Sequence, residues 1–270
     1  MTSIESKFSH LTAAGRNGFI PFVTAGDPDL ETSLKIVQAL ADTGADIIEL
    51  GVPFSDPMAD GPTIQRSSQR ALKNGTNLNQ ILGLVKDLRK SSDVPVVLFS
   101  YLNPLLRYGI KKLRDDASDV GIDGVLVTDA VEDEAKEISD LLTEKNIDLI
   151  SLVAPTTTDE RLAKIGSTAR GFIYAVSRAG VTGARADTSA EAEKLVTRVR
   201  KFTDLPVAVG FGISTAQQVR DVWRYADAAV VGSAIVSEIE KHTDTADLPE
   251  HIKSFVSSII PEFAKSTDEI

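Results

Sequence analysis

Eight short apolar runs recur along the 270-residue chain, and longer stretches with helical periodicity separate them. Each run is nearly continuously apolar, which is typical of strands buried on both faces of a parallel sheet. Between the runs, apolar side chains fall on one helical stripe, as Leu34, Val37 and Leu40 do. The predicted strands are 19–25, 46–51, 95–99, 122–127, 147–153, 171–176, 206–210 and 227–231, and the helical stretches include 30–43, 131–145 and 189–202.

This eightfold alternation of strand and helix predicts a parallel sheet with helices outside it. Eight units in 270 residues fit a closed (β/α)8 barrel, or TIM barrel, which often runs to about 250 residues. An open, doubly wound sheet is the alternative, but the glycine fingerprint that often follows its first strand is missing, because 24–29 reads Thr-Ala-Gly-Asp-Pro-Asp. We therefore expect one barrel domain over 1–270, with an extra helix at 2–14 capping its bottom, an added helix at 248–263 and a frayed polar tail at 264–270.

The residue types at the carboxyl ends of the predicted strands limit the chemistry, because barrel active sites lie at that end. No lysine lies there, so a Schiff-base aldolase would lack its nucleophile. The chain has no cysteine, and its three histidines, His10, His242 and His251, lie on predicted terminal or outer helices. A thiol nucleophile, a Ser–His pair and a His-ligated metal at the barrel mouth are therefore not expected.

Carboxylates are the reactive groups that remain. Glu49 interrupts an otherwise apolar strand, and it is either a solvated or ion-paired group or a general acid/base whose pKa an apolar pocket raises. Asp56 and Asp60 follow on the same strand–loop unit; either one alone is typical of a turn, but the combination with Glu49 favours acid/base chemistry. Paired carboxylates also suggest a glycosidase, yet aromatic residues make up only 6% and the single Trp223 lies on a predicted helix.

Glycines follow the last two predicted strands, at 210–214 and 232–233. Backbone N–H groups at a helix N-terminus bind anions, and glycine lets a phosphate approach the backbone closely. These are the loops where barrels bind phosphate, although the same glycine patterns also occur in ordinary turns. The loop 177–189 carries Arg178 and Arg185, and it is either a lid over such a ligand or a mobile surface loop.

The net charge disfavours nucleic acid as a partner, because 29 basic and 39 acidic residues leave −10 and no dense Lys/Arg tract offsets it. The N-terminus has no long apolar segment of the secretory type, and no run of about 18 apolar residues predicts a membrane span. A chain without cysteine forms no disulfide and suits a reducing cytoplasm.

Several of these segments resemble the tryptophan synthase alpha subunit family. The stretch 48–61 (Ile-Glu-Leu-Gly-Val-Pro-Phe-Ser-Asp-Pro-Met-Ala-Asp-Gly) closely resembles the family's signature, and 21–28, 177–183, 210–214 and 232–236 are similar in order and spacing. The resemblance implies a TIM barrel lyase that splits indole-3-glycerol phosphate into indole and glyceraldehyde 3-phosphate by a retro-aldol step of tryptophan biosynthesis. It implies a beta subunit as partner, which carries pyridoxal phosphate in an αββα assembly and receives indole through a tunnel. The alpha subunit itself is implied to use no cofactor and no metal.

The family's functional residues match positions in this chain. By resemblance, Glu49 protonates the indole ring carbon and helps to deprotonate the glycerol hydroxyl, Asp60 holds the indole N–H, and Tyr174 contacts the substrate and positions Glu49. Protonation of indole C3 creates an electron sink, so carboxylates suffice where other aldolases use a lysine or a metal. The implied substrate-binding residues are Phe22 at the indole ring and Thr182, with Gly183, Phe211, Gly212, Gly232 and Ser233 at the phosphate. The implied interface with the beta subunit comprises Asp56, Pro57 and Asp129.

One loop departs from the family pattern. After the fourth predicted strand the family usually reads Val-Pro-Asp-Leu-Pro, whereas 127–131 reads Val-Thr-Asp-Ala-Val, which keeps Asp129 but neither proline. In the family this aspartate interacts with the 53–62 loop. Without the prolines the 127–131 loop is less preorganised. We expect this change to affect communication with the beta subunit more than it affects catalysis.

Three other functions stay open. One is a stand-alone indole-3-glycerol-phosphate lyase that works without a beta subunit. Another is an isomerase or epimerase on the same phosphate-binding barrel, although strand 5 ends Val153-Ala-Pro155 without the aspartate that such isomerases generally need. The last is a regulatory subunit without activity, which the intact Glu49 and Asp60 disfavour.

Overall fold

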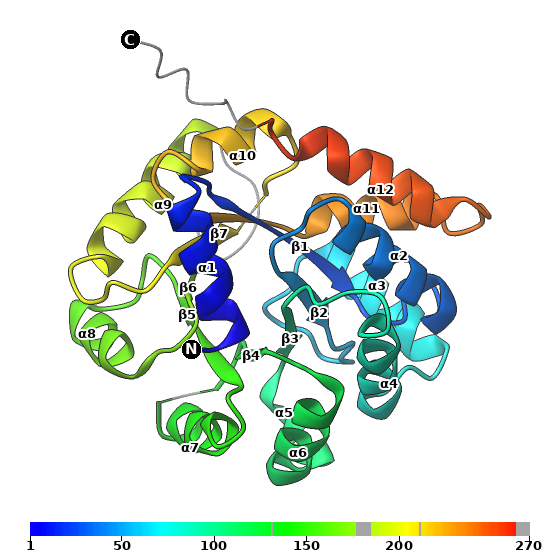
Figure 1. The fold of residues 1–270 in the computed structure, drawn as a ribbon, viewed down its shortest axis with the longest axis horizontal. Helices are drawn as coiled ribbons and strands as arrows, with labels where there is room; N and C mark the ends of the chain where they lie inside the picture. Colours follow the sequence, from blue (N-terminus) through cyan, green and yellow to red (C-terminus); the bar gives the residue numbers. More distant parts are fainter. Residues whose placement is uncertain (131, 177–184, 211, 263–270) are drawn as a thin grey trace.

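Eight parallel strands close into a barrel with helices around it (Figure 1). The structure is a computed structural model that describes residues 1–130, 132–176, 185–210 and 212–262, with only the backbone described at 132–133 and 185–189. Neighbouring strands pair in sequence order, and β1 closes the ring by pairing with β8. The strands are β1 Gly18–Thr24, β2 Ile48–Gly51, β3 Val96–Ser100, β4 Gly124–Val127, β5 Asp148–Val153, β6 Ile173–Val176, β7 Val207–Gly210 and β8 Ala228–Val231.

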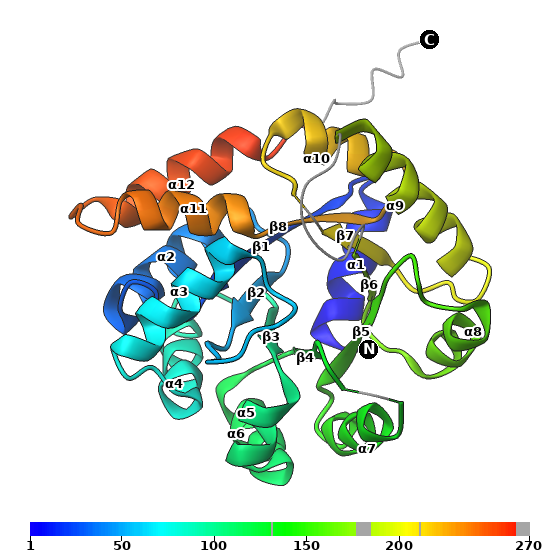
Figure 2. The same cartoon turned by 180° about the vertical axis from the view of Figure 1, so that it is seen from behind.

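The helices form the outer ring of the barrel, with one further helix at its base (Figures 1 and 2). Within the described ranges they are α1 Ser3–Ala13, α2 Leu30–Asp42, α3 Pro62–Lys73, α4 Leu78–Leu88, α5 Leu102–Tyr108, α6 Ile110–Val120, α7 Glu132–Thr143, α8 Asp159–Thr168, α9 Arg185–Val199, α10 Ala216–Val222, α11 Ser233–Lys241 and α12 Leu248–Ile259. No helix in these ranges is both long and apolar enough to cross a membrane.

The predicted (β/α)8 barrel and all eight predicted strands are confirmed, with shifts of one or two residues at the strand ends. The predicted C-terminal helix at 248–263 is too long, because α12 ends at Ile259. Pro261 disfavours helical backbone at the residue before it, and Ile260 is extended at φ −76° and ψ 117°. The predicted tail at 264–270 lies outside the described residues.

The N-terminal helix α1 lies across the amino-terminal ends of the strands (Figure 1). Thr2 caps it, because its side chain accepts from the Glu5 N–H while the Glu5 carboxylate accepts from the Thr2 N–H. Its apolar face belongs to the cluster inside the barrel, and Phe8 packs on Phe172 at a centroid distance of 5.7 Å. Because α1 seals this end, as the sequence predicts, the carboxyl ends of the strands form the mouth.

Candidate active site

Glu49 points into the barrel from β2. Side chains alternate along a strand, and Ile47, two residues earlier, belongs to the interior apolar cluster. The Glu49 side chain is fully buried, and neither of its carboxyl oxygens has a hydrogen-bond partner. This burial raises the pKa of Glu49 to about 8, because water is not there to solvate the charge. Glu49 is therefore a neutral acid near pH 7, and the alternative of a solvated or ion-paired group does not hold.

Aromatic rings surround this acid near the mouth. Phe22 on β1 pairs in register with Glu49, and its ring meets Phe99 edge to face at 5.3 Å. Phe99 in turn meets Tyr174 at 6.2 Å. Gly51 makes room for the Phe22 ring, since a Cβ at that position would lie 2.6 Å from its Cζ. The sequence alone singled out Phe22 and Tyr174 but not Phe99, which reads as an ordinary strand residue.

Tyr174 stands next to Glu49 without bonding to it. Burial raises the pKa of the Tyr174 hydroxyl well above its usual range, and a negative charge on Glu49 raises it further. No hydrogen bond joins the two side chains, because both oxygens of Glu49 are without a partner. A positioning of Glu49 through a direct bond is therefore not seen, and the predicted contact of Tyr174 with substrate stays a prediction.

Asp60 lies in the loop that connects β2 to α3. Its backbone N–H closes a turn on the Pro57 carbonyl, and Gly61 and Pro62 then start α3, where proline suits the first helical position. Burial raises the pKa of Asp60 to about 6, and a hydrogen bond from the Tyr101 hydroxyl acts in the opposite direction. Asp60 is therefore mostly ionised at pH 7, in contrast to Glu49.

Tyr101 ties this loop to the barrel. Its hydroxyl donates to Asp60 and accepts from the Ala59 N–H at 2.9 Å. Burial, followed by the charge of Asp60, raises the pKa of Tyr101 to about 12. Its ring also packs on Phe54 at 5.2 Å. Tyr101 follows a predicted strand, but nothing in its local pattern reveals the contact with a loop some forty positions earlier.

The predicted interface residues lie on the outer side of this region. Asp56 is exposed, Pro57 is partly buried, and the neighbouring Met58 is 93% exposed. The Asp129 carboxylate accepts from the Leu102 N–H at 2.6 Å and so caps the start of α5. Asp129 is thus bonded to the residue after Tyr101, whose hydroxyl contacts the 53–62 loop at Ala59, and a direct contact of Asp129 with that loop stays a prediction.

The predicted phosphate site falls at the start of α11. Gly232 precedes this helix and offers no side-chain cap, so the first backbone N–H groups of α11 are not engaged by one. Ser233 is exposed, and Gly212 after β7 is exposed with a positive φ of 64° that favours glycine. A Cβ on Gly232 would lie 3.3 Å from the Cβ of Phe22. The predicted phosphate site therefore lies beside the aromatic wall that Phe22, Phe99 and Tyr174 form. The predicted substrate contacts Thr182, Gly183 and Phe211 lie outside the described residues.

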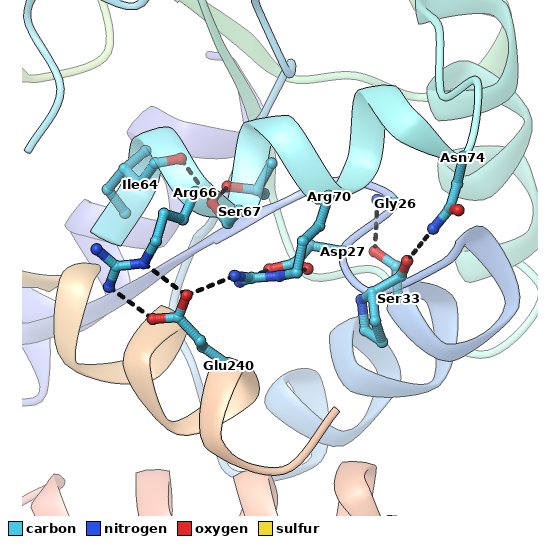
Figure 3. A network of polar contacts seen from close by, with 11 residues as sticks. Gly26, Asp27, Ser33, Ile64, Arg66, Ser67, Arg70, Asn74 and Glu240 are labelled. Atoms are coloured by element: carbon cyan, nitrogen blue, oxygen red, sulfur yellow. Dashed lines mark hydrogen bonds and ion pairs between the residues drawn. The ribbon is translucent and has the colours of Figure 1, made fainter. Parts of the chain in front are cut away.

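A chain of ion pairs holds the elements around the site (Figure 3). Asp27, in the loop after β1, is 1% exposed and accepts two hydrogen bonds from Arg70 on α3, at 2.7 and 2.8 Å. Arg70 also donates to Glu240 on α11 at 2.7 Å, and Arg66 donates twice to the same Glu240. The network connects the helix that follows Asp60 to the helix that starts at the predicted phosphate site. Sequence reasoning missed Arg70 and Glu240, which look like surface charges on amphipathic helices.

The hydroxyl of Thr24 extends this framework at the end of β1. Its Oγ1 lies 2.6 Å from Ser67 Oγ, and Ser67 also donates to the Ile64 carbonyl within α3. Asp27 and Thr24 lie at the carboxyl end of β1, which is the end of the barrel where active sites are expected. Both are engaged in structural contacts, whereas the carboxyl group of Glu49 has no hydrogen-bond partner.

A cavity of about 600 Å³ lies elsewhere, on the outside of β5 between α7 and α8. Neither Glu49 nor Asp60 lines it, so this cavity does not contain the two candidate carboxylates.

Fold and site together define a (β/α)8-barrel enzyme with a neutral buried glutamic acid and an ionised aspartate near its mouth. The family model of the tryptophan synthase alpha chain matches residues 8–259. The alpha chain from Thermoanaerobacter sp. (strain X514) is 45% identical over 259 residues, which cover 96% of this chain and 98% of that one. The alpha chain from Acidiphilium cryptum (strain JF-5) is 49% identical over 245 residues, 90% of this chain and 89% of that one.

Solved structures agree. The crystal structure of tryptophan synthase subunit alpha from Legionella pneumophila str. Paris matches with a TM-score of 0.89 at 33% identity, and the match covers 96% of this chain and 97% of that one. The chain belongs to the tryptophan synthase alpha chain family. It is a carbon–carbon lyase of tryptophan biosynthesis that cleaves indole-3-glycerol phosphate. The comparisons give no support to an isomerase or epimerase.

Proposed function

We propose that Glu49 is the general acid and base of the cleavage of indole-3-glycerol phosphate and that Asp60 is its charged counterpart. The observation that carries this proposal is the state of Glu49, which is fully buried at the barrel mouth end without any hydrogen-bond partner. An unpaired buried carboxyl is costly to keep, so its presence needs a reason in the chemistry. Environments that push two carboxyl pKa values apart assign the acid and the base roles.

In this proposal Glu49 alone gives one proton to the substrate and takes one proton back. Neutral Glu49 gives its proton to C3 of the indole ring, which turns the ring into an iminium-like electron sink. The carboxylate formed then takes the proton of the glycerol hydroxyl. The bond between C3 and the side chain breaks as the aldehyde forms, and its electron pair returns to the ring. Indole and glyceraldehyde 3-phosphate leave, and Glu49 is neutral again. A pKa of about 8 suits a group that must both give and take a proton near neutral pH.

Asp60 acts on the other side of the ring in this proposal. With a pKa of about 6, it is mostly ionised at pH 7 and accepts the indole N–H. Its charge stabilises the positive charge that develops on the ring after protonation of C3. The Tyr101 hydroxyl, which donates to Asp60, orients this carboxylate.

The indole ring and the phosphate of the substrate would each have a suitable binding surface in the barrel. Phe22 and Phe99 supply an apolar wall for the indole ring, and Tyr174 completes it. The start of α11, from Gly232 to Ser233, offers backbone N–H groups and the positive end of a helix dipole to the phosphate. Because protonated indole is its own electron sink, we propose that this chain uses no cofactor and no metal for the cleavage.

We further propose that a tryptophan synthase beta subunit, which holds pyridoxal phosphate, binds over the β2–α3 loop in an αββα assembly. Met58 in that loop and Leu106 on α5 are 93% and 56% exposed, and large apolar side chains of this kind favour a protein contact. Asp56, Pro57 and Asp129 belong to the same region. A cytoplasmic location, which the composition without cysteine fits, is part of the proposal.

Substitution of Glu49→Gln tests the catalytic role. Glutamine keeps the size and the neutral state of the residue but cannot give and take the proton. We expect kcat for indole release from indole-3-glycerol phosphate to fall by about 10³-fold or more, while the affinity for glycerol phosphate stays within about threefold. Glu31→Gln, on the exposed face of α2, is the matched control and should keep full activity.

The same assay run with and without a cognate beta subunit tests the partner. Strong acceleration of indole release by the partner supports a coupled alpha subunit, whereas equal and fast release in both cases points to a stand-alone lyase.

Substantial turnover by the Glu49→Gln protein would overturn the acid/base role.

A further inference from the structure

Two of the chain's three histidines meet outside the active site, where α11 and α12 pack together. His242 directly follows α11 and His251 lies in the first turn of α12, and their rings are 3.8 Å apart between centroids. Glu238, one helical turn before His242, completes the group. His251 Nε2 lies 3.3 Å from Glu238 Oε2, and His242 Nδ1 lies 3.9 Å from the same oxygen. One potential ligand atom from each of the three residues lies within 4.8 Å of the other two.

The chemistry of this group fits a divalent transition ion. Imidazole nitrogen and carboxylate oxygen are ligands of Zn²⁺, and sites with two histidines and one glutamate leave a further position for water. Glu238 divides its oxygens, because Oε1 binds Lys241 at 2.7 Å while Oε2 faces both histidines. His242 Nδ1 lies 3.0 Å from the Glu238 backbone oxygen, and such a bond from one ring N–H commonly orients a ligating histidine, which leaves Nε2 of His242 as the atom for the ion.

Accessibility and composition strengthen the case. The side chains of His242 and His251 are 32% and 38% exposed, so an ion can reach them and the rings can turn from their stacked arrangement toward it. The chain has no cysteine and only one other histidine, His10, which is on α1 at the base of the barrel. Two thirds of the chain's imidazole ligands are thus gathered at this one contact between helices.

We propose that Glu238, His242 and His251 form a binding site for Zn²⁺ or a similar divalent transition ion that cross-links α11 to α12. The two helices follow each other along the outside of the barrel, as Figure 1 shows in orange and red. α11 starts at the predicted phosphate site, and α12 packs on both α11 and α2. A bound ion would fasten the C-terminal helix to the element that starts at the barrel mouth.

The test uses the full chain with its purification tag removed, because a tag would bind the same ions. Co²⁺ titration followed by visible absorption, with Zn²⁺ as competitor, reports the affinity and the ligand type. We expect one ion per chain, and at least tenfold weaker binding in His242→Ala and in His251→Ala. His10→Ala is the matched control and should bind as the natural chain does. Amide hydrogen exchange in α12 should slow with Zn²⁺ in the natural chain and in His10→Ala only.

Two results would overturn the proposal. One is binding that is equally tight in the natural chain and in the His242→Ala/His251→Ala double variant, which would place the ion elsewhere. The other is no saturable binding of Zn²⁺ or Co²⁺ by the natural chain. Circular dichroism of each variant ensures that a loss of binding is not a loss of fold, and Glu238→Gln gives an independent reading of the carboxylate ligand.

Discussion

The hydroxyl of Tyr174 occupies the place beside Gly210 where any other residue would carry its Cβ. A Cβ at position 210 would lie 2.3 Å from the Tyr174 hydroxyl oxygen and 2.9 Å from its Cζ, and real structures essentially never show such contacts. Glycine at the end of β7 is therefore a condition for the position of Tyr174 next to Glu49. The sequence suggested that the glycines after this strand serve the phosphate, whereas the first of them serves the aromatic wall.

Substitution of Gly210→Ala should consequently damage the site through Tyr174. The added methyl group forces the tyrosine or the β7 backbone to move, and overpacking of this kind costs about 2 kcal/mol of folding free energy. We expect a lower kcat/KM for indole release together with a lower urea midpoint. Gly83→Ala on α4, where nothing lies within 4 Å of the new Cβ, should keep the activity unchanged and should not lower the urea midpoint, because alanine favours a helix interior over glycine. Full activity of Gly210→Ala would show that the position of Tyr174 is unimportant.

The two carboxyl pKa values predict a bell-shaped pH dependence of kcat/KM. Glu49 must be protonated, so activity should fall as the pH rises through about 8. Asp60 must be ionised, so activity should fall as the pH drops through about 6. Steady-state kinetics of indole release across this range measure both limbs. A rate that keeps rising above about pH 8 would contradict the role of Glu49 as an acid.

The acidic limb needs a control, because the substrate's phosphate also titrates near pH 6. Asp60→Asn removes the protein's share of that limb. We expect this variant to be slower by about 10²-fold and to retain only the change that the phosphate causes. An unaltered acidic limb in Asp60→Asn would assign it to the substrate alone.

Glu49 also predicts how stability depends on pH. Its pKa is about 8 in the folded protein and near the ordinary 4.5 in the unfolded chain, so the folded state holds a proton that the unfolded state has lost. Stability from this group is present at low pH and is lost as the pH rises between these values. Glu49→Gln removes the effect. Urea unfolding should therefore show the variant gaining about 3 kcal/mol relative to the natural chain between about pH 5 and about pH 8. Parallel pH profiles would mean that Glu49 ionises freely.

The ion pair between Arg70 and the buried Asp27 should contribute strongly to the free energy of unfolding. Arg70→Met leaves the buried Asp27 without its cation, which costs about 3 kcal/mol in urea unfolding. Arg66→Met is the matched control on the same helix; its side chain is 51% exposed, and its loss should cost about 0.5 kcal/mol. The double variant Asp27→Asn/Arg70→Met should recover part of the loss. Equal effects of the two arginine substitutions would refute the special role of the buried pair.

Local patterns were sufficient for the architecture. The apolar runs predicted every strand, because strands buried on both faces must be apolar along their whole length. The same logic exposed Glu49, since a single acid in such a run needs a reason, and the structure confirms that it is buried. Helix ends were less well predicted. α12 stops before Pro261, and a proline that would have revealed this end was read as part of the helix.

The sequence by itself determined the barrel, the lack of cysteine and the lack of a lysine at the predicted strand ends, because strand periodicity and residue types are local properties. Only the tertiary structure decided which groups meet. Tyr101 reaches Asp60, Arg70 joins Asp27 to Glu240, and His251 faces His242. These contacts join positions on different elements, so no spacing along the chain reveals them. The pKa of Glu49 is likewise a tertiary property, because it follows from how completely the closed barrel removes water from one carboxyl group.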